Sequence, residues 1–501
     1  MSGFVALIDG LPERFAQRAL LIDAQGALMA DAARAQILEL AGLWSRSGAR
    51  TIASALDNGR QALLVDLSIQ YAGRTQLALP PYFSAAQREH ALEDAGADTL
   101  LLPVGQPPPA GWVAGEACSA IADCAVWRRR RDASCLPQGT ACVTYTSGST
   151  GTPRGICLDA ASLLRTAAAL QQAFADLPIA AHLCMLPLST LLEAVGCYAA
   201  LSRGATLHLP GLAMLGYSGA AGMDASRLFA TWRAARADSL ILVPQLLTVL
   251  VHLLERHPEC ALRPQLVAVG GAKVPSGLLQ RAEALGLPVF EGYGLSEAGS
   301  VVALNRPGAL RAGSVGRVLP HFQLRFAADG EIWLRGQSPL RRAGDPPCCD
   351  ADGWWPTGDL GRVDQDGFLH LSGRKRNCFI TAYGRNVSPE WIEAELQALP
   401  GVVQAVVDGE GQPVNLAVVS GSHAAFDAGD GAAALDALNR RLPDYARVAS
   451  LVWSDRPWTV LNGLATGNGR ARRDVVLAQH AAQLTDCRFQ LSENTEQGVH
   501  A

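Results

Sequence analysis

A run of small and hydroxyl-bearing residues, TYTSGSTGTPRG at 144–155, follows an apolar stretch of this 501-residue chain. Glycine, serine and threonine let backbone N–H groups and hydroxyls surround phosphate oxygens closely, and Arg154 adds a positive charge. The spacing is not that of the G-x-x-x-x-G-K-[ST] loop of Walker-type proteins. Because a flexible linker would not need this ordered pattern with Pro153 inside it, the run predicts a loop that binds phosphates.

Two acidic residues lie in short motifs further along, Glu297 in EGYGLSEAG at 291–299 and Asp359 in TGDLG at 357–361. A carboxylate in a turn is suited to accept hydrogen bonds from both hydroxyls of a ribose. Considered alone, Glu297 is typical of a surface acid, and Tyr293 is as typical of a core aromatic as of a ligand contact. The interpretation of both residues therefore depends on the motifs around them.

Together these motifs resemble the adenylate-forming superfamily, which includes acyl-CoA synthetases, luciferases and nonribosomal-peptide adenylation domains. The resemblance covers roughly residues 140–475 and is greatest with long-chain fatty acyl-CoA synthetases. It implies that ATP β- and γ-phosphates are embraced by Thr146, Ser147, Gly148, Ser149, Thr150 and Gly151. Arg154 stands where the family usually has lysine, so the charge is kept while the donor geometry changes.

The resemblance also implies roles for residues around the rest of the nucleotide. The implied contacts are those of Gly271 and Ala272 with adenine and the acyl group, of Tyr293 and Gly294 with adenine, of Ser296 with phosphate, and of Asp359 and Arg374 with ribose. Glu297 would hold the Mg²⁺ that bridges phosphate oxygens during displacement at the α-phosphorus. Catalytic roles fall to Thr146, Glu297 and Arg470.

Arg470 marks a departure from the family pattern. Family members usually carry a lysine near the C-terminus that bridges the substrate carboxylate and the phosphate, whereas TVLNGLATGNGRARRD at 459–474 offers Arg470. The chain has only two lysines, Lys273 and Lys375, among 42 basic residues. Either this arginine bias has exchanged one working cation for another, or adenylation is slow or absent. Arginine is no base, but it pairs bidentately with carboxylate or phosphate.

The segment MLPLSTLLEAVGCYAALSRGATLHLP at 185–210 resembles long-chain acyl-CoA synthetases and lacks an aspartate that would bind an α-amino group. Its apolar or small residues would suit a medium or long acyl chain, although such residues are as often core: Leu191, Leu192, Val195 and Gly196. The expected thiol acceptor is coenzyme A, or the phosphopantetheine of an acyl carrier protein acting in trans. Alternatives are a degenerate member that binds nucleotide or acyl ligand with weak adenylation, and an enzyme that passes the acyl-adenylate to another acceptor, for example in lactone formation.

Alternating strand-like and helical segments would position these motifs. Apolar runs predict buried strands at 61–68, 98–104, 141–146, 182–188, 205–210, 239–244, 265–271 and 287–294. Helical segments such as 31–44 and 161–177 lie between them, which is typical of parallel sheets with helices on both faces. Beyond residue 310 the short strand-like runs 330–336 and 366–374 predict a β-rich subdomain.

The expected architecture is therefore α/β. A large N-terminal AMP-binding domain, 1–373, would contain two layered α/β subdomains and the small β-rich subdomain. A small mobile α+β lid domain would follow at 374–480, with a hinge near Arg376, and a polar tail at 481–501.

Composition excludes several other classes. Charged residues make up 18% of the chain and the net charge is −4, so no nucleic-acid or acidic-membrane partner is indicated. The twelve cysteines show no C-x-x-C pair, which argues against a zinc site or disulfide framework and favours a reducing cytoplasm. The N-terminus lacks the pattern of a secretory signal, and no apolar run of about 20 residues predicts a membrane span.

Overall fold

The computed structural model describes residues 3–131, 135–146, 154–218, 222–258, 262–340, 342, 348–466 and 469–498. Its larger sheet has nine strands in the order β18-β17-β16-β15-β14-β10-β11-β1-β2. The bounds are β1 Ala19–Asp23, β2 Gly26–Met29, β10 Ala181–Leu183, β11 Thr206–His208, β14 Ser239–Leu242, β15 Leu266–Val269, β16 Val289–Tyr293, β17 Ala303–Leu304 and β18 Arg317–Val318. The six strands from β16 to β1 are parallel, and the three outer strands are antiparallel.

Helices pack on both faces of this sheet, as predicted. Val267 and Val269 of β15 contribute to a core cluster with α8 Ala225–Ala235, α9 Pro244–Arg256 and α10 Ser276–Ala284. Leu266 points to the opposite face, where it joins a cluster that contains Phe174, at the end of α6 Ala160–Ala173, and Phe290. Successive strand residues thus reach two different cores, as the pleat requires.

A second sheet of seven strands carries the predicted phosphate loop at one edge, in the order β6-β7-β5-β3-β4-β8-β9. The bounds are β3 Thr51–Ser54, β4 Thr75–Ala78, β5 Thr99–Pro103, β6 Val113–Ala114, β7 Cys124–Arg128, β8 Thr140–Thr146 and β9 Arg154–Asp159. The strands β5, β3, β4 and β8 are parallel, whereas β9 returns antiparallel to β8. The helix α5 Ala85–Asp94 follows β4.

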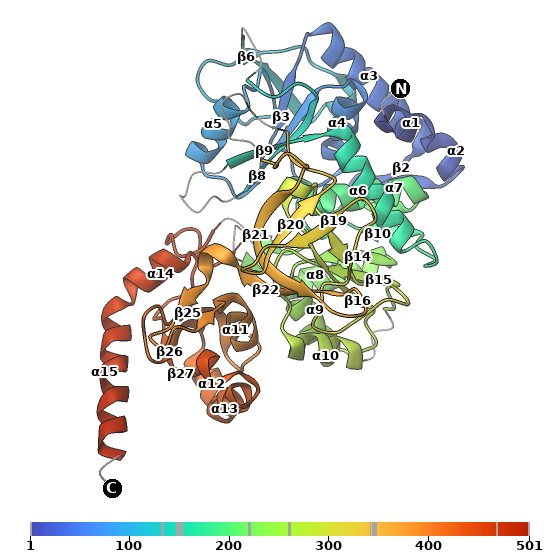
Figure 1. Cartoon of the computed structure of the whole chain (residues 1–501). Helices are drawn as coiled ribbons and strands as arrows, with labels where there is room; N and C mark the ends of the chain where they lie inside the picture. The colour runs from blue at the N-terminus through green and yellow to red at the C-terminus, as the bar shows by residue number, and fades with distance from the viewer. Residues whose placement is uncertain are drawn as a thin grey trace.

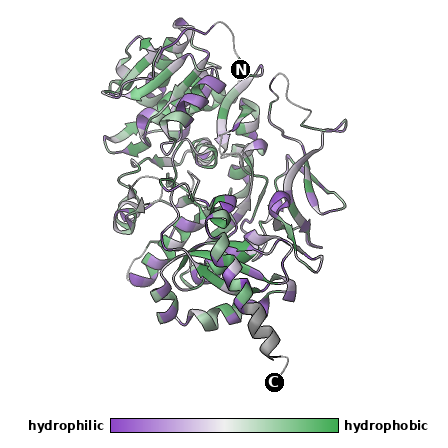
Figure 2. Ribbon diagram, turned by 90° about the vertical axis from the view of Figure 1, so that its left-hand side faces the viewer, coloured by the Kyte–Doolittle hydropathy of each residue, from purple (hydrophilic) through white to green (hydrophobic). Residues whose placement is uncertain are grey.

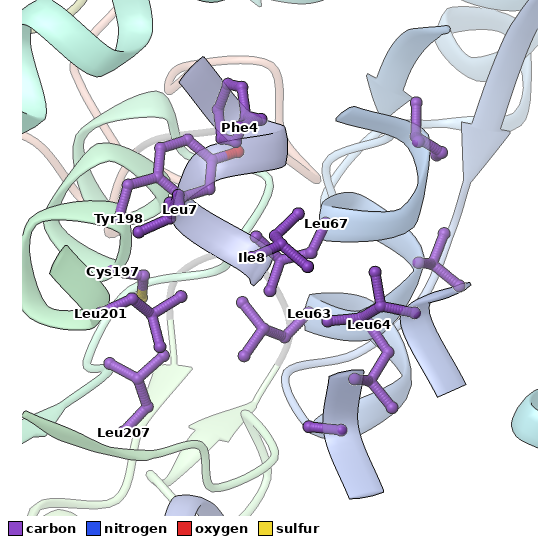
Figure 3. Packing of buried hydrophobic residues seen from close by; sticks show 14 of the residues in the cluster. Phe4, Leu7, Ile8, Leu63, Leu64, Leu67, Cys197, Tyr198, Leu201 and Leu207 are labelled. Atoms are coloured by element: carbon purple, nitrogen blue, oxygen red, sulfur yellow. The ribbon is translucent and has the colours of Figure 1, made fainter. Parts of the chain in front are cut away.

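Residues 61–68, predicted as a strand, are helical instead. They belong to α4 Arg60–Tyr71, in which every residue from 63 to 70 is buried. Figure 3 shows why: Leu63, Leu64 and Leu67 face Ile8 of α1 Gly3–Asp9, and α1 in turn packs on α7 Leu191–Arg203. A helix covered on all sides has no polar stripe, so its sequence lacks the 3.6-residue period that would have distinguished it from a buried strand.

The remaining helices of the large region are α2 Leu11–Phe15 and α3 Ala30–Arg46, the latter as predicted at 31–44. The predicted β-rich subdomain is also present as a four-stranded antiparallel sheet, β19 Gln323–Phe326, β20 Glu331–Arg335, β21 Trp355–Val363 and β22 Leu369–Arg374. In Figure 1 this sheet lies between the two large sheets and the C-terminal elements. Figure 2 shows hydrophobic residues concentrated in the inner strands and hydrophilic ones on outward-facing helices.

After β22 the chain passes through a short 3₁₀ turn, η3 Lys375–Asn377, into an α+β unit. Its elements are β23 Phe379–Ile380, β24 Asn386–Val387, α11 Pro389–Leu396, β25 Val402–Asp408, β26 Asn415–Gly421, α12 His423–Ala428, α13 Gly431–Arg441 and β27 Val448–Trp453. Two core clusters here contain only residues from Phe379 onward. The C-terminal unit therefore has hydrophobic cores of its own.

The C-terminal part of the chain, expected as a polar tail from residue 481, is helical over most of its length. After α14 Arg473–Gln479, α15 Ala481–Gly498 projects from the body in Figure 1. Leu484 anchors its first turn in the last core cluster. In the part of the chain that the structure describes, no helix is both long and apolar enough to cross a membrane.

Candidate active site

Asp359 lies at the centre of the site, on β21. Its Oδ2 accepts a hydrogen bond from the Tyr293 hydroxyl at 2.6 Å, and its Oδ1 lies 2.6 Å from Nε of Arg374. Tyr293 ends β16, and Arg374 ends β22 opposite Asp359 in the antiparallel pair. The structure thus joins three predicted nucleotide contacts in one chain of hydrogen bonds. The ring of Tyr293 is buried and packs in a core cluster, so this tyrosine is a core aromatic.

Burial raises the pKa of Asp359, and Arg374 and the Tyr293 hydroxyl act in the opposite direction. The carboxyl is 5% exposed, whereas the side chain of Arg374 keeps 41% of its surface in solvent. Each carboxylate oxygen has a second lone pair, so both can still accept a hydroxyl hydrogen bond. This arrangement fits a carboxylate that binds a ribose.

Glu297 lies beside this pair, in the 3₁₀ turn η2 Ser296–Ala298 that follows β16. It is half-buried and raises the pKa of Asp359 through its negative charge. Among the described residues its carboxylate has no hydrogen-bond or ion-pair partner, which fits a group that binds a cation together with phosphate oxygens. Gly294 lies just before this turn. A Cβ at this position would lie 1.5 Å from the Ser300 carbonyl oxygen, so only glycine fits.

The predicted phosphate loop begins at the end of β8, where Thr146 pairs with Arg154 of β9. Ser147, Gly148, Ser149, Thr150 and Gly151 lie outside the described residues, as does the side chain of Thr146. Arg154 is exposed, and β9 packs beside η2. The strand that follows the loop therefore lies beside the turn that contains Glu297.

The turn of Gly271 and Ala272 follows β15 and is exposed. Gly271 adopts φ +84°, in the left-handed region where glycine is favoured. Ser296, half-buried, follows the end of the neighbouring strand β16. Because ligands of α/β sheets bind beyond the carboxyl ends of parallel strands, both turns occupy positions suited to a nucleotide.

Arg470 reaches this site from the C-terminal unit. Its charge interacts with Asp359 and Glu390, and it also lowers the pKa of Tyr82, although burial raises that pKa overall, to about 12. Reduced hydration lowers the pKa of Arg470, and the positive charge of Arg374 acts in the same direction. By its solvent-accessible surface Arg470 is nevertheless an exposed residue, and arginine stays protonated. Arg470 therefore lies within electrostatic range of Asp359, and its catalytic role stays a prediction.

The four apolar residues proposed for acyl binding divide into two pairs. Leu191 lines a small cavity of about 10 Å³, and Leu192 lies 3.8 Å from the position that a Gly270 Cβ would occupy. Val195 is fully buried in the core, and Gly196 accommodates the packed side chain of Ile241. A cavity of that size has room for about one water molecule, so it holds no acyl chain as it stands.

Sequence reasoning missed several contacts around the site. Thr357 accepts a hydrogen bond from the Asp359 backbone at 3.1 Å. Glu395 of α11 bonds the backbone N–H and hydroxyl of Ser276 at 3.3 and 3.0 Å, which joins the C-terminal unit to the first turn of α10. No motif marks Glu395, because its partner lies 119 residues away.

A sequence model of the AMP-binding enzyme family matches residues 30–341, more than half of the chain. The chain therefore belongs to this family of adenylate-forming proteins. Long-chain-fatty-acid–CoA ligase FadD15 of Mycobacterium bovis is 40% identical over 162 residues, 32% of this chain and only 27% of that relative. An indoleacetate–CoA ligase of Aromatoleum aromaticum is 29% identical over 411 residues, 77% of this chain and 75% of that relative.

Solved structures share the fold over nearly the whole chain. The o-succinylbenzoate–CoA synthetase MenE of Bacillus subtilis, in complex with ATP and magnesium, gives a TM-score of 0.73 at 21% identity, covering 93% of this chain and 98% of that one. The amide bond synthetase McbA of Marinactinospora thermotolerans gives 0.73 at 21% identity, covering 94% and 99%. This likeness confirms the predicted α/β architecture.

Proposed function

We propose that the chain uses ATP and Mg²⁺ to convert a carboxylic acid to its acyl-adenylate and then transfers the acyl group to the thiol of coenzyme A. The supporting observation is the position of Asp359, held by Tyr293 and Arg374 with Glu297 and Arg470 in electrostatic range. The family assignment and the names of the relatives, which are CoA ligases, agree with this activity.

In the first half-reaction a carboxylate oxygen bonds to the α-phosphorus while the bond to pyrophosphate breaks. Asp359 would fix the ribose, and the loop from Thr146 to Arg154 would bind the β- and γ-phosphates. Arg470 would pair with the substrate carboxylate or the α-phosphate, so that charge developing there meets a fixed cation. Glu297 would hold Mg²⁺, whose contribution is to offset the charge of the departing pyrophosphate.

In the second half-reaction the thiolate of coenzyme A attacks the acyl carbonyl carbon, and the bond to AMP breaks. We propose that residues 374–480 form a lid that turns about the segment near Arg376 between the two steps. The separate hydrophobic cores on either side of that segment support this division. An acyl carrier protein could supply the same thiol chemistry in trans.

For the acid we propose a medium- or long-chain fatty acid. Support comes from the segment shared with the mycobacterial fatty-acid ligase and from the apolar Leu192 beside the Gly270 turn. The relative with the longer match acts, by its name, on indoleacetate. A panel of fatty acids, indoleacetate and o-succinylbenzoate, with ATP and CoA and products identified by mass spectrometry, tests the choice. Turnover of the aromatic acids alone would contradict it.

Variants of Arg470 test the reaction itself when the half-reactions are measured separately. We expect Arg470→Ala to lower acid-dependent pyrophosphate exchange about 100-fold or more, the usual loss for one fixed donor at a developing charge. Arg470→Lys should retain most of the activity. Thioester formation from synthetic acyl-adenylate should change little in either variant. Equal exchange in wild type and Arg470→Ala would exclude a catalytic role for Arg470, and no exchange with any acid would favour a degenerate family member.

A further inference from the structure

Three segments distant in sequence meet at the base of the phosphate loop. Both terminal nitrogens of Arg342 contact the carboxylate of Asp94, at 2.5 and 2.9 Å, and Nη1 also lies 3.2 Å from the Asp94 carbonyl oxygen. The Tyr145 hydroxyl donates to Asp94 Oδ2 at 2.5 Å, with the Ala91 carbonyl 3.1 Å away. Asp94 thus connects the end of α5 with β8 and with the segment after β20.

These groups pack directly on the two strands that carry the loop. Tyr145 is paired with Gly155 across β8 and β9, one step before the Thr146–Arg154 pair at which the loop starts and ends. A Cβ on Gly155 would lie 2.6 Å from Nη2 of Arg342, 2.9 Å from Oδ2 of Asp94 and 3.0 Å from Cζ of Tyr145. Gly155 is therefore the residue that lets the cluster approach the backbone of β9.

The segment of Arg342 is itself attached to β9. The N–H of Leu340 donates to the Cys157 carbonyl at 2.8 Å, and the two residues form an antiparallel bridge. The negative charge of Asp94 is compensated within the cluster. Burial alone would raise the pKa of Asp94, but the hydrogen bonds from Arg342 and Tyr145 outweigh burial and keep this pKa below its usual value. A carboxylate at a helix C-terminus is unfavourable unless a cation compensates it, and Arg342 does so.

We propose that Asp94, Arg342 and Tyr145 form a positioning cluster for the phosphate-binding loop, which sets the separation and angle of β8 and β9 and so the affinity for the ATP triphosphate. The inference rests on the proposed ATP-binding function of that loop. The three residues act through the backbone and do not touch the nucleotide. Their loss raises KM for ATP while the sites for the acid and ribose keep their geometry.

The test compares Asp94→Asn with a matched control, Glu255→Gln. Arg281 also makes two bonds to the Glu255 carboxylate, from Nε at 2.8 Å and from Nη2 at 2.7 Å, on helices α9 and α10, away from the loop. We expect Asp94→Asn to raise KM for ATP about tenfold, the equivalent of one charge-assisted hydrogen bond, with KM for the acid unchanged within about twofold. Tyr145→Phe, which removes one oxygen, should shift KM in the same direction by less.

Hydrogen–deuterium exchange supplies a readout that does not require activity. Amides of β8 and β9, at 140–146 and 154–159, should exchange faster in Asp94→Asn and Tyr145→Phe than in wild type or Glu255→Gln. If the wild type turns over no acid, the proposed function fails, but these exchange rates still test the cluster. Exchange in β8 and β9 equal to that of the control, or equal increases in KM for ATP and for the acid, would overturn the inference.

Discussion

Replacing Asp359 by asparagine tests the centre of the proposed nucleotide site. The side chain keeps its shape and can still accept the Tyr293 hydrogen bond, but it loses the negative charge that pairs with Arg374 at 2.6 Å. Because Arg374 is partly exposed, its guanidinium can be hydrated again, so we expect only a small loss of stability. The main effect should fall on ATP binding.

The size of the effect follows from the bonds that the carboxylate can make. A hydrogen bond to a charged group contributes about 1.5–3 kcal/mol, against about 0.5–1.5 kcal/mol for a neutral one. Two ribose hydroxyls bonded to a neutral amide in place of the carboxylate therefore lose about 2–3 kcal/mol together. That loss corresponds to a rise of about 30- to 150-fold in KM for ATP.

The assay is pyrophosphate exchange with ATP and with 2′,3′-dideoxy-ATP, in wild type and Asp359→Asn. The wild type should strongly prefer ATP. The variant should lose most of that preference, because in Asp359→Asn the ribose hydroxyls of ATP no longer have a charged partner. Asp364→Asn is the control, because Asp364 follows the same strand and pairs with Arg311 at 2.7 Å. If Asp359→Asn discriminated between the two nucleotides as well as wild type does, Asp359 would not be the ribose ligand.

Three further changes have expected outcomes of their own. Glu297→Gln should raise the Mg²⁺ concentration for half-maximal exchange about tenfold, because a carboxylate binds this cation and an amide binds it poorly; an unchanged Mg²⁺ dependence would contradict the assignment. Burial raises the pKa of Asp66 to about 7, so this carboxyl stabilises the fold fully below its unfolded pKa near 4 and loses that contribution as pH rises through 7. The Tm of Asp66→Asn relative to wild type should therefore increase between pH 5 and pH 8 in thermal scans. Glu395→Gln should slow adenylation about two- to fivefold by weakening the contact with Ser276, without slowing thioester formation from synthetic acyl-adenylate.

Most of the strands that the sequence predicted are present in the structure, because parallel strands buried on both faces are short apolar runs between helices, as in β14 and β15. It failed at α4, where complete burial removed the periodicity of the helix. Periodicity reports contact with water, and α4 has almost none. The helix α4 is instead enclosed by α1, α3 and the sheet.

The site was predictable where a short motif carries the chemistry and unpredictable where distant segments meet. Asp359, Glu297 and Arg470 each stand in a recognisable motif. In the structure, Glu297 and Arg470 lie within electrostatic range of Asp359. The Asp94–Arg342 pair spans 248 residues, and neither residue stands in a motif. Contacts of this kind follow from how the sheets pack, which local sequence does not encode.

The contacts between the C-terminal unit and the rest bear on the proposed movement of Arg470 away from Asp359. Lys375 pairs with Asp329 and Glu331 at 2.6 and 2.8 Å, and Glu395 bonds Ser276. The Lys375–Asp329 pair is exposed, and exposed pairs contribute about 0–1 kcal/mol each, whereas Glu331 is buried. Among the described residues, the cores after Phe379 include no side chain from the large region. Lys273 also lies over the Trp391 ring, 5.9 Å from its centroid. Because these contacts are few and mostly polar, we propose that a ligand with a differential affinity of a few kcal/mol reverses the orientation.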